Sequence, residues 1–94
     1  MKIKVFNMQS SRGNNVPNQF EIEIYNNKGD TTCRYFQSYQ SIIVMKKKGE
    51  TYLDKDTWNY SITTSKYRGF YLGESTAETK AKIKSGEYKL KNLN

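Results

Sequence analysis

Aromatic, basic and hydroxyl-bearing residues are closely interleaved between Trp58 and Gly73. Aromatic rings stack on nucleic-acid bases, while cations and small hydroxyl groups bind phosphates or the acidic surface of a protein. Within this stretch, Tyr67 and Arg68 follow the polar run 63–66, which we expect to be an exposed loop that collects binding residues. The same mixture is also typical of an ordinary strand, so it indicates binding without identifying the partner.

The charge of the chain points the same way. It has 16 Lys and Arg against 9 Asp and Glu, a net charge of +7, and +5 of this excess falls in residues 46–94. A field of this sign speeds association with polyanions, although solubility alone also favours it. The clearest run, Lys46 to Lys48, either contacts phosphates or keeps a hairpin tip soluble and unpaired. The candidate binding residues are Arg34, Tyr35, Lys46, Lys47, Lys48, Lys66, Tyr67 and Arg68.

Few residues of the chain are suited to catalysis. There is no histidine, the usual acid–base residue near neutral pH, and the single Cys33 has neither a disulfide partner nor a second thiol to share a metal with. Asp54 and Asp56 flank a lysine in a predicted turn, where we expect solvated carboxylates. No glycine-rich phosphate-binding motif occurs. We therefore predict no enzyme activity, no catalytic residues, no metal and no cofactor.

The length of 94 residues and the mass of 11.0 kDa predict one domain, residues 1–94, with a thin core. Aromatic residues make up 14% of the chain, so they must provide much of the buried surface. No apolar run is long enough for a signal peptide or a membrane span. These features predict a cytoplasmic protein that does not contact membranes.

The elements that position the candidate residues follow from the apolar pattern. Apolar and charged residues alternate in 3–5 and again in 20–24, which predicts two half-buried strands separated by a polar loop over 9–18. The turn residues 26–29 predict a hairpin whose return strand runs through 33–36. The run 42–45 has no polar face, as in a strand covered on both sides.

The second half of the chain predicts more strands and one helix. Residues 46–50 form a charged turn, residues 52–53 and 58–62 resemble strands, and residues 88–90 form a last strand. In the second of these, Trp58, Tyr60 and Ile62 would share the buried face. A capping-box spacing at 75–78 with Gly86 beyond predicts a short helix near residues 76–85. The fold class is α+β: a mainly antiparallel meander of five or six strands with one short C-terminal helix.

Several runs of this sequence resemble small uncharacterised proteins carried by phages and conjugative plasmids of Gram-positive bacteria. They are YFQSY at 35–39, SII at 41–43, YLD at 52–54, WNYS at 58–61, TTSKYR at 63–68, LGE at 72–74 and KIKSGEY at 82–88. The resemblance covers about residues 35–94 and involves no catalytic motif. It implies a mobile-element origin, and small non-enzymatic proteins of such elements often act on host nucleic-acid machinery or block defence systems such as CRISPR nucleases.

Together these observations predict a non-catalytic binding protein whose partner is nucleic acid or a nucleic-acid-handling host complex. In this hypothesis the candidate lysines and Arg68 neutralise phosphates or acidic side chains, and Tyr67 stacks on a base. The alternative is an antidefence inhibitor, similar to an anti-CRISPR protein, that binds a host nuclease through its basic surface.

Overall fold

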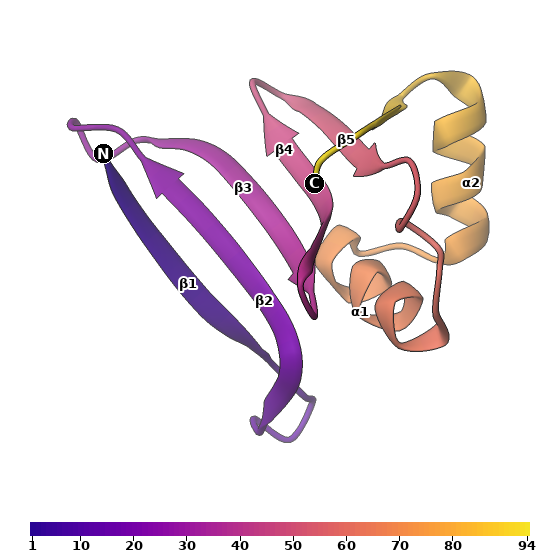
Figure 1. Cartoon of the computed structure of the whole chain (residues 1–94), viewed down its shortest axis with the longest axis horizontal. Coiled ribbons are helices and arrows are strands. Elements are labelled where there is room, and N and C mark those ends of the chain that lie inside the picture. Colours follow the sequence, from indigo (N-terminus) through magenta and orange to yellow (C-terminus); the bar gives the residue numbers. More distant parts are fainter.

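The computed structural model describes all residues, 1–94. The chain forms one six-stranded sheet in sequence order, with two helices between the fifth and sixth strands (Figure 1). Neighbouring strands are antiparallel, except that the last strand runs parallel to the fifth. The elements are β1 (Lys2–Gln9), β2 (Asn15–Tyr25), β3 (Thr31–Ser38), β4 (Ser41–Lys47), β5 (Glu50–Asp54), α1 (Ile62–Leu72), α2 (Thr76–Ser85) and β6 (Tyr88–Lys91). The predicted α+β class and meander are confirmed.

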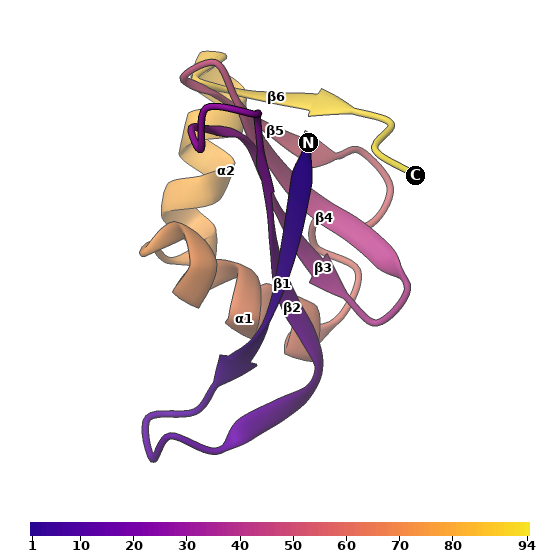
Figure 2. The ribbon, with the colours of Figure 1, turned by 90° about the vertical axis from the view of Figure 1, so that its left-hand side faces the viewer.

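Both helices lie on one side of the sheet, which leaves the other side without a helical layer (Figure 2). The core between the two layers is small, as the chain length predicts. The ring of Phe36 on β3 stacks on Tyr71 of α1 with centroids 5.6 Å apart. The buried cluster consists of Met8, Phe36, Ile43, Val44, Leu53 and Tyr88, against which Trp58, Tyr67, Tyr71, Leu72 and Ile83 pack.

The turn between β4 and β5 contains a glycine, whereas the turn between β3 and β4 consists of Tyr39 and Gln40, with Tyr39 at a φ of 56°. Lys48 and Gly49, with φ of 52° and 77°, form the two-residue turn between β4 and β5, as a type I′ turn requires. The prediction of a loop over residues 9–18 is only partly right, because β1 extends to Gln9 and β2 already begins at Asn15. The β1–β2 pairing shifts register there, and the bulge accommodates Pro17, which has no N–H to donate.

The largest error of the sequence analysis concerns residues 58–72. We predicted a strand over 58–62 and a loop after it, but residues 58–60 form a turn and α1 follows. The side chain of Ser61 caps the helix by accepting a hydrogen bond from the backbone N–H of Thr64 at 3.1 Å. Tyr60 and Ile62, predicted to be buried, are 50% and 91% exposed because they precede and begin the helix instead of facing a sheet core.

The predicted C-terminal helix is confirmed as α2. Ser75 and Glu78 form the expected capping box, and Gly86 ends the helix in the left-handed conformation. Its only buried residue is Thr79, so the helix packs lightly on the sheet. Neither α1 nor α2 has the length and apolar character that a membrane-crossing helix needs.

Candidate functional site

The structure brings four of the predicted binding residues together at one end of the β3–β4 hairpin. Arg34 lies opposite Lys46 in the sheet register, and Lys47 and Lys48 follow on the same strand and its turn. The four line a shallow depression of about 340 Å³. The sequence separates Arg34 from the lysines by a dozen residues, and the antiparallel pairing of β3 with β4 closes that gap.

Arg34 and Lys46 point to the helix side of the sheet, where their charges are partly used within the fold. Arg34 forms a salt bridge with Glu23 at 3.1 Å. The ammonium group of Lys46 lies 4.7 Å from the centre of the Tyr71 ring. Its half-burial lowers the pKa of Lys46, and repulsion from Arg34 lowers it further, while Glu21 and Glu74 act in the opposite direction. These two cations are therefore less available to a partner than the sequence suggested.

The next lysines point to the helix-free side. Because side chains alternate along a strand, Lys47 on β4 and Tyr52 on β5 face away from the helices. Lys89 and Lys91 on β6 share that side. The buried Tyr88 of the same strand points toward the helices, where its hydroxyl donates to Glu74, so Lys89 and Lys91 point the opposite way. We call this surface the basic sheet face. It consists of Tyr35, Lys47, Lys48, Tyr52, Lys89 and Lys91.

Acidic residues compensate only part of this charge. Glu50 binds Lys89 at 3.0 Å and also accepts a hydrogen bond from the Tyr52 hydroxyl at 2.6 Å. Lys91 instead lies over the ring of Tyr52, with its nitrogen 5.4 Å from the ring centre. Lys47 and Lys48 are exposed and form no salt bridge. The basic sheet face thus presents three lysines without an acidic partner beside an aromatic ring.

The acid at the opposite end of β5, Asp54, does not neutralise the lysines. It is 2% exposed, contrary to the expectation of a solvated turn carboxylate. Its oxygens accept hydrogen bonds from the backbone and hydroxyl of Thr57 and from the backbone of Leu93. Burial alone would raise the pKa of Asp54, but these hydrogen bonds outweigh it and the pKa is lowered. Asp54 therefore stabilises the turn after β5 and the C-terminal segment.

Tyr35 is half-buried on the same face, next to Met45 and Cys33. A hydrogen bond with the Cys33 thiol, together with burial, raises the pKa of Tyr35 to about 12. The phenol is therefore neutral at physiological pH and adds no negative charge to the basic sheet face.

The remaining three predicted residues are on α1, and they are arranged differently from the prediction. Lys66 is exposed and its ammonium group lies 5.3 Å from the centre of the Tyr67 ring. Tyr67 is half-buried against the core, with its ring edge-on to Phe70. Arg68 is completely buried, so its assignment as an exposed cation is wrong. The reason is the helix, which turns position 68 inward together with Thr64.

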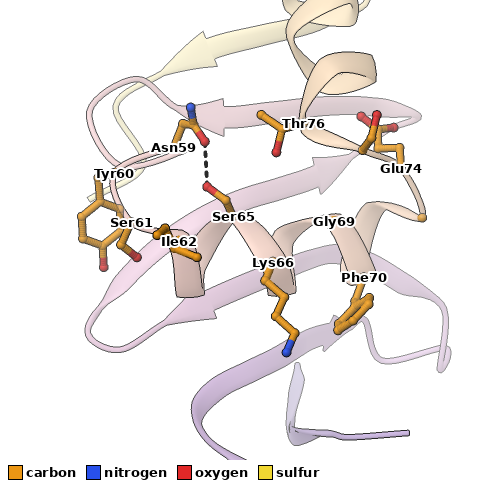
Figure 3. Close-up of a pocket in the computed structure, with 12 residues that line it drawn as sticks. Asn59, Tyr60, Ser61, Ile62, Ser65, Lys66, Gly69, Phe70, Glu74 and Thr76 are labelled. Carbon is orange, nitrogen blue, oxygen red and sulfur yellow. Dashed lines mark hydrogen bonds between the residues drawn. The ribbon is translucent and has the colours of Figure 1, made fainter.

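A broad groove of about 990 Å³ runs along the outer side of α1. Figure 3 shows Asn59 and Ser65 joined by a hydrogen bond of 2.7 Å, with Thr76 of α2 nearby and Lys66 and Phe70 extending from the opposite side of the helix. Gly69 lies between these two sets, and its missing side chain leaves the middle of the groove open. We call this hollow the α1 groove. Its lining residues are Asn59, Tyr60, Ser61, Ile62, Ser65, Lys66, Gly69, Phe70, Gly73, Glu74, Ser75 and Thr76.

Arg68 lies beneath the polar side of the α1 groove. Its guanidinium group donates to the backbone carbonyl of Trp58, to the Thr76 hydroxyl at 2.8 Å and, more weakly, to Asn59 and Ser65 at 3.3 and 3.4 Å. The group also lies 5.1 Å from the centre of the Trp58 ring. Burial lowers the pKa of Arg68, and attraction to Glu74 opposes this effect. No three Asp, Glu or Cys side chains gather anywhere in the chain as a metal-binding group would require.

A family model matches residues 3–88, nearly the whole meander and both helices. The chain belongs to DUF8033, a family of unknown function. No curated protein and no solved structure matches it. For this DUF8033 chain, the candidate sites are therefore defined by their geometry alone.

The sequence did not indicate Tyr52 as part of the binding surface of this DUF8033 chain, and it gave Lys89 and Lys91 only as a possible extension of a positive surface toward the C-terminus, outside the candidate binding residues. Lys89 and Lys91 alternate with apolar residues, so they were expected on one face of a last strand. The neighbour of that strand could not be read from the pattern. β6 pairs with β5 only because α1 and α2 carry the chain back in the parallel direction, and α1 was not predicted: its region was expected to be a strand over 58–62 followed by a loop. The alternation of lysines with apolar residues over 88–91 was the sequence signal that could have placed Lys89 and Lys91 on one surface.

Proposed function

We propose that this chain is a non-catalytic protein that binds nucleic acid through the basic sheet face. The observation that carries the proposal is that Lys47, Lys48 and Lys91 surround Tyr52 on an exposed sheet surface without acidic partners. The three lysines and Tyr52 line one depression of about 430 Å³, together with Met45 and with Glu50, whose charge is paired with Lys89. Cations beside aromatic rings on a rigid surface bind the phosphates and the bases of a single strand at the same time.

The shape of the surface favours a single strand as the ligand. The helix-free side of the sheet is open (Figure 2), so unstacked bases can lie against rings such as Tyr52 and Tyr35 while the backbone follows the lysines. Lys89 and Lys91 lie about 7 Å apart on one strand, because each residue advances the chain by about 3.4 Å. No helix lies on this side to enter the groove of a duplex.

Fluorescence anisotropy with labelled single-stranded DNA and RNA tests the proposal. The protein should bind both with an affinity that falls steeply with salt, because each lysine that contacts a phosphate releases counterions. Reversing two charges of the basic sheet face in the Lys47→Glu and Lys91→Glu double variant should weaken binding by about 100-fold or more. It should also reduce the slope of log affinity against log salt by about 1.4, since each phosphate contact with a single strand contributes about 0.7.

The matched control has the same net charge but reverses two exposed lysines on α2. A double variant with Lys80→Glu and Lys84→Glu changes the overall field equally and leaves the basic sheet face intact. It should bind within about threefold of the unaltered protein at moderate salt, where fields are screened beyond about 10 Å. Equal losses in both double variants would show that only net charge attracts the oligonucleotide, and the proposed face would be wrong.

The resemblance to proteins of phages and conjugative plasmids supports a cytoplasmic setting in a bacterial host, where nucleic acid is accessible. An antidefence inhibitor would use the same lysines against the acidic surface of a host nuclease. No oligonucleotide binding even at low salt would reject the proposal in favour of that alternative.

A further inference from the structure

Arg68 is a buried charge that no acidic residue of the chain contacts directly. The residue is 0% exposed and forms no salt bridge, and its Nε has no hydrogen-bond partner. Burying a charge is costly unless an opposite charge pairs with it. The acid that acts on Arg68 through space is Glu74, whose carboxylate is already bound by Thr79, Lys82 and Tyr88.

The α1 groove above Arg68 offers hydrogen-bond donors in excess. The hydroxyl oxygens of Ser61 and Ser75 accept from backbone N–H groups, and that of Thr76 accepts from Arg68. None of these three hydroxyl groups donates to another group of the protein, so each can donate to a ligand. The exposed ammonium group of Lys66 adds a charge at the opposite side. The groove therefore suits a negatively charged group.

Large apolar side chains border the same groove. Ile62, Phe70 and Tyr60 are 91%, 62% and 50% exposed, and all three line the groove together with the donors. Exposed apolar side chains grouped around polar ones are typical of a surface that another protein covers. A nucleic-acid strand would leave Ile62 without an apolar partner, whereas a peptide segment supplies both kinds of contact.

We infer that the α1 groove binds an acidic segment of a protein partner, with a carboxylate above the buried Arg68 and apolar side chains against Ile62 and Phe70. The hydroxyl groups of Thr76, Ser61 and Ser75 donate to the carboxylate, and Lys66 adds a second cation at the groove edge. The groove is lined by residues of α1 and its flanks, and α1 lies on the helical side of the sheet (Figure 2), whereas strand alternation places the basic sheet face on the other side. The inference is independent of the proposed binding of nucleic acid and adds a protein-binding surface to it.

The hydrogen bonds by which Arg68 joins α1 to its neighbouring segments do not by themselves explain why a charged group is buried there. Its bonds to the Trp58 carbonyl and Thr76 hold the start of α1 and the start of α2 together. These partners are neutral, so they satisfy hydrogen bonds but leave the charge uncompensated. A carboxylate at the groove surface would supply the missing opposite charge.

An NMR titration of the ¹⁵N-labelled full chain tests the inference with two capped peptides. One contains two glutamates between two leucines, and the other replaces both glutamates by glutamines. The glutamate peptide should cause saturable shifts at the amides of Ser61, Ser65 and Thr76. Its affinity should exceed that of the glutamine peptide by about tenfold, because only a carboxylate is attracted by the charges of Lys66 and of Arg68 beneath the groove.

Substitutions at exposed groove residues should leave the fold intact, so they test binding separately from folding. The double variant Ile62→Ser and Lys66→Gln should bind the glutamate peptide at least fivefold more weakly, since it loses one apolar contact and one cation. The control variant Val5→Ser and Lys28→Gln removes a similar exposed apolar residue on β1 and one charge in the turn between β2 and β3, both outside the groove lining, and should bind normally. Equal affinities for both peptides, shifts located on the basic sheet face, or no saturation at millimolar peptide would each overturn the inference.

Discussion

Arg68 joins three parts of the chain that are separate in sequence. Its guanidinium group binds the carbonyl of Trp58 before α1 and the hydroxyl of Thr76 at the start of α2, while its ring contact with Trp58 covers it on one side. Guanidinium suits this position because its donors point in fixed and different directions. The charge of Arg68 made it a candidate binding residue in the sequence, but in the structure the side chain stabilises the fold from inside.

Replacing Arg68 by lysine should therefore destabilise the protein although the charge is kept. Arg68→Lys leaves one nitrogen, which cannot reach both Trp58 and Thr76, and we expect a loss of about 2 to 3 kcal/mol in the free energy of unfolding. Urea unfolding followed by circular dichroism measures it. The exposed substitution Lys66→Arg is the control and should stay within about 0.5 kcal/mol. An Arg68→Lys variant as stable as the original protein would contradict the contacts described.

Glu74 links stability to pH. Its burial alone would raise the pKa of the carboxyl group, but hydrogen bonds from Thr79, Tyr88 and Lys82 outweigh burial, so the pKa of Glu74 is lowered. A carboxylate with a lowered pKa in the folded state stabilises the fold fully above its unfolded value of about 4.3. This stability is lost as pH falls from that value through the folded pKa.

We accordingly expect the free energy of unfolding to decrease as pH falls below about 4.3, and to decrease less in the Glu74→Gln variant. The variant should be less stable than the original at pH 7, and the difference should shrink in acid. Urea unfolding at a series of pH values measures both effects. Parallel pH profiles for the two proteins would show that Glu74 is not the linked group.

At the scale of elements, α1 is where sequence and structure differ most. The sheet and α2 could be predicted because their signals are local: alternation in 20–24, a turn at Lys48–Gly49, and the capping box at Ser75. The buried face of α1 instead includes Thr64 and Arg68, which are polar. Their spacing is helical and continues to Tyr71, but no apolar pattern marks it. The β-branched and aromatic residues before it imitate a strand.

The candidate site was only partly predictable for the same reason. The cluster of Arg34 with the lysines at 46–48 depends on a hairpin that the sequence shows clearly. The basic sheet face depends on β6 pairing in parallel with β5, which requires both helices as the connection. Because α1 was not predicted, the pairing of β6 with β5 could not be predicted either, nor could the position of Lys91 beside Tyr52.

Gly69 tests the close packing of α1 on the segment that follows it. Alanine normally stabilises a helix interior by about 1 kcal/mol relative to glycine. A Cβ at position 69, however, would lie 2.9 Å from the backbone oxygen of Glu74. Gly69→Ala should therefore lower the free energy of unfolding by about 1 kcal/mol, because backbone must move to relieve the contact. Thermal unfolding measures the change.

An exposed position of the same helix provides the contrast. Thr63→Ala replaces a β-branched residue at an exposed site and should raise the free energy of unfolding by a few tenths of a kcal/mol, or about 0.5 at most. Stabilisation by both alanines would mean that α1 does not approach Glu74 as closely as the structure shows.

For the whole molecule, the single sheet separates two kinds of surface. The helical side carries the α1 groove, with a buried cation and exposed apolar residues. The helix-free side is apolar along β1 and β2, where Ile3 and Val5 are 55% and 61% exposed, and basic along β4 to β6. Several acids form contacts within the fold, such as Glu74 with Lys82 and Asp54 with Thr57. Part of the net charge of +7 is therefore gathered on one surface, the basic sheet face.

The measurement that tests the central claim most directly is an NMR map of the full chain with a short single-stranded oligonucleotide. The account predicts saturable shifts at the amides of Tyr35, Lys47, Tyr52 and Lys91, accompanied by shifts of the Tyr52 ring protons, with α1 and α2 unaffected. Shifts concentrated on the helices, or scattered over all exposed lysines without saturation, would contradict it.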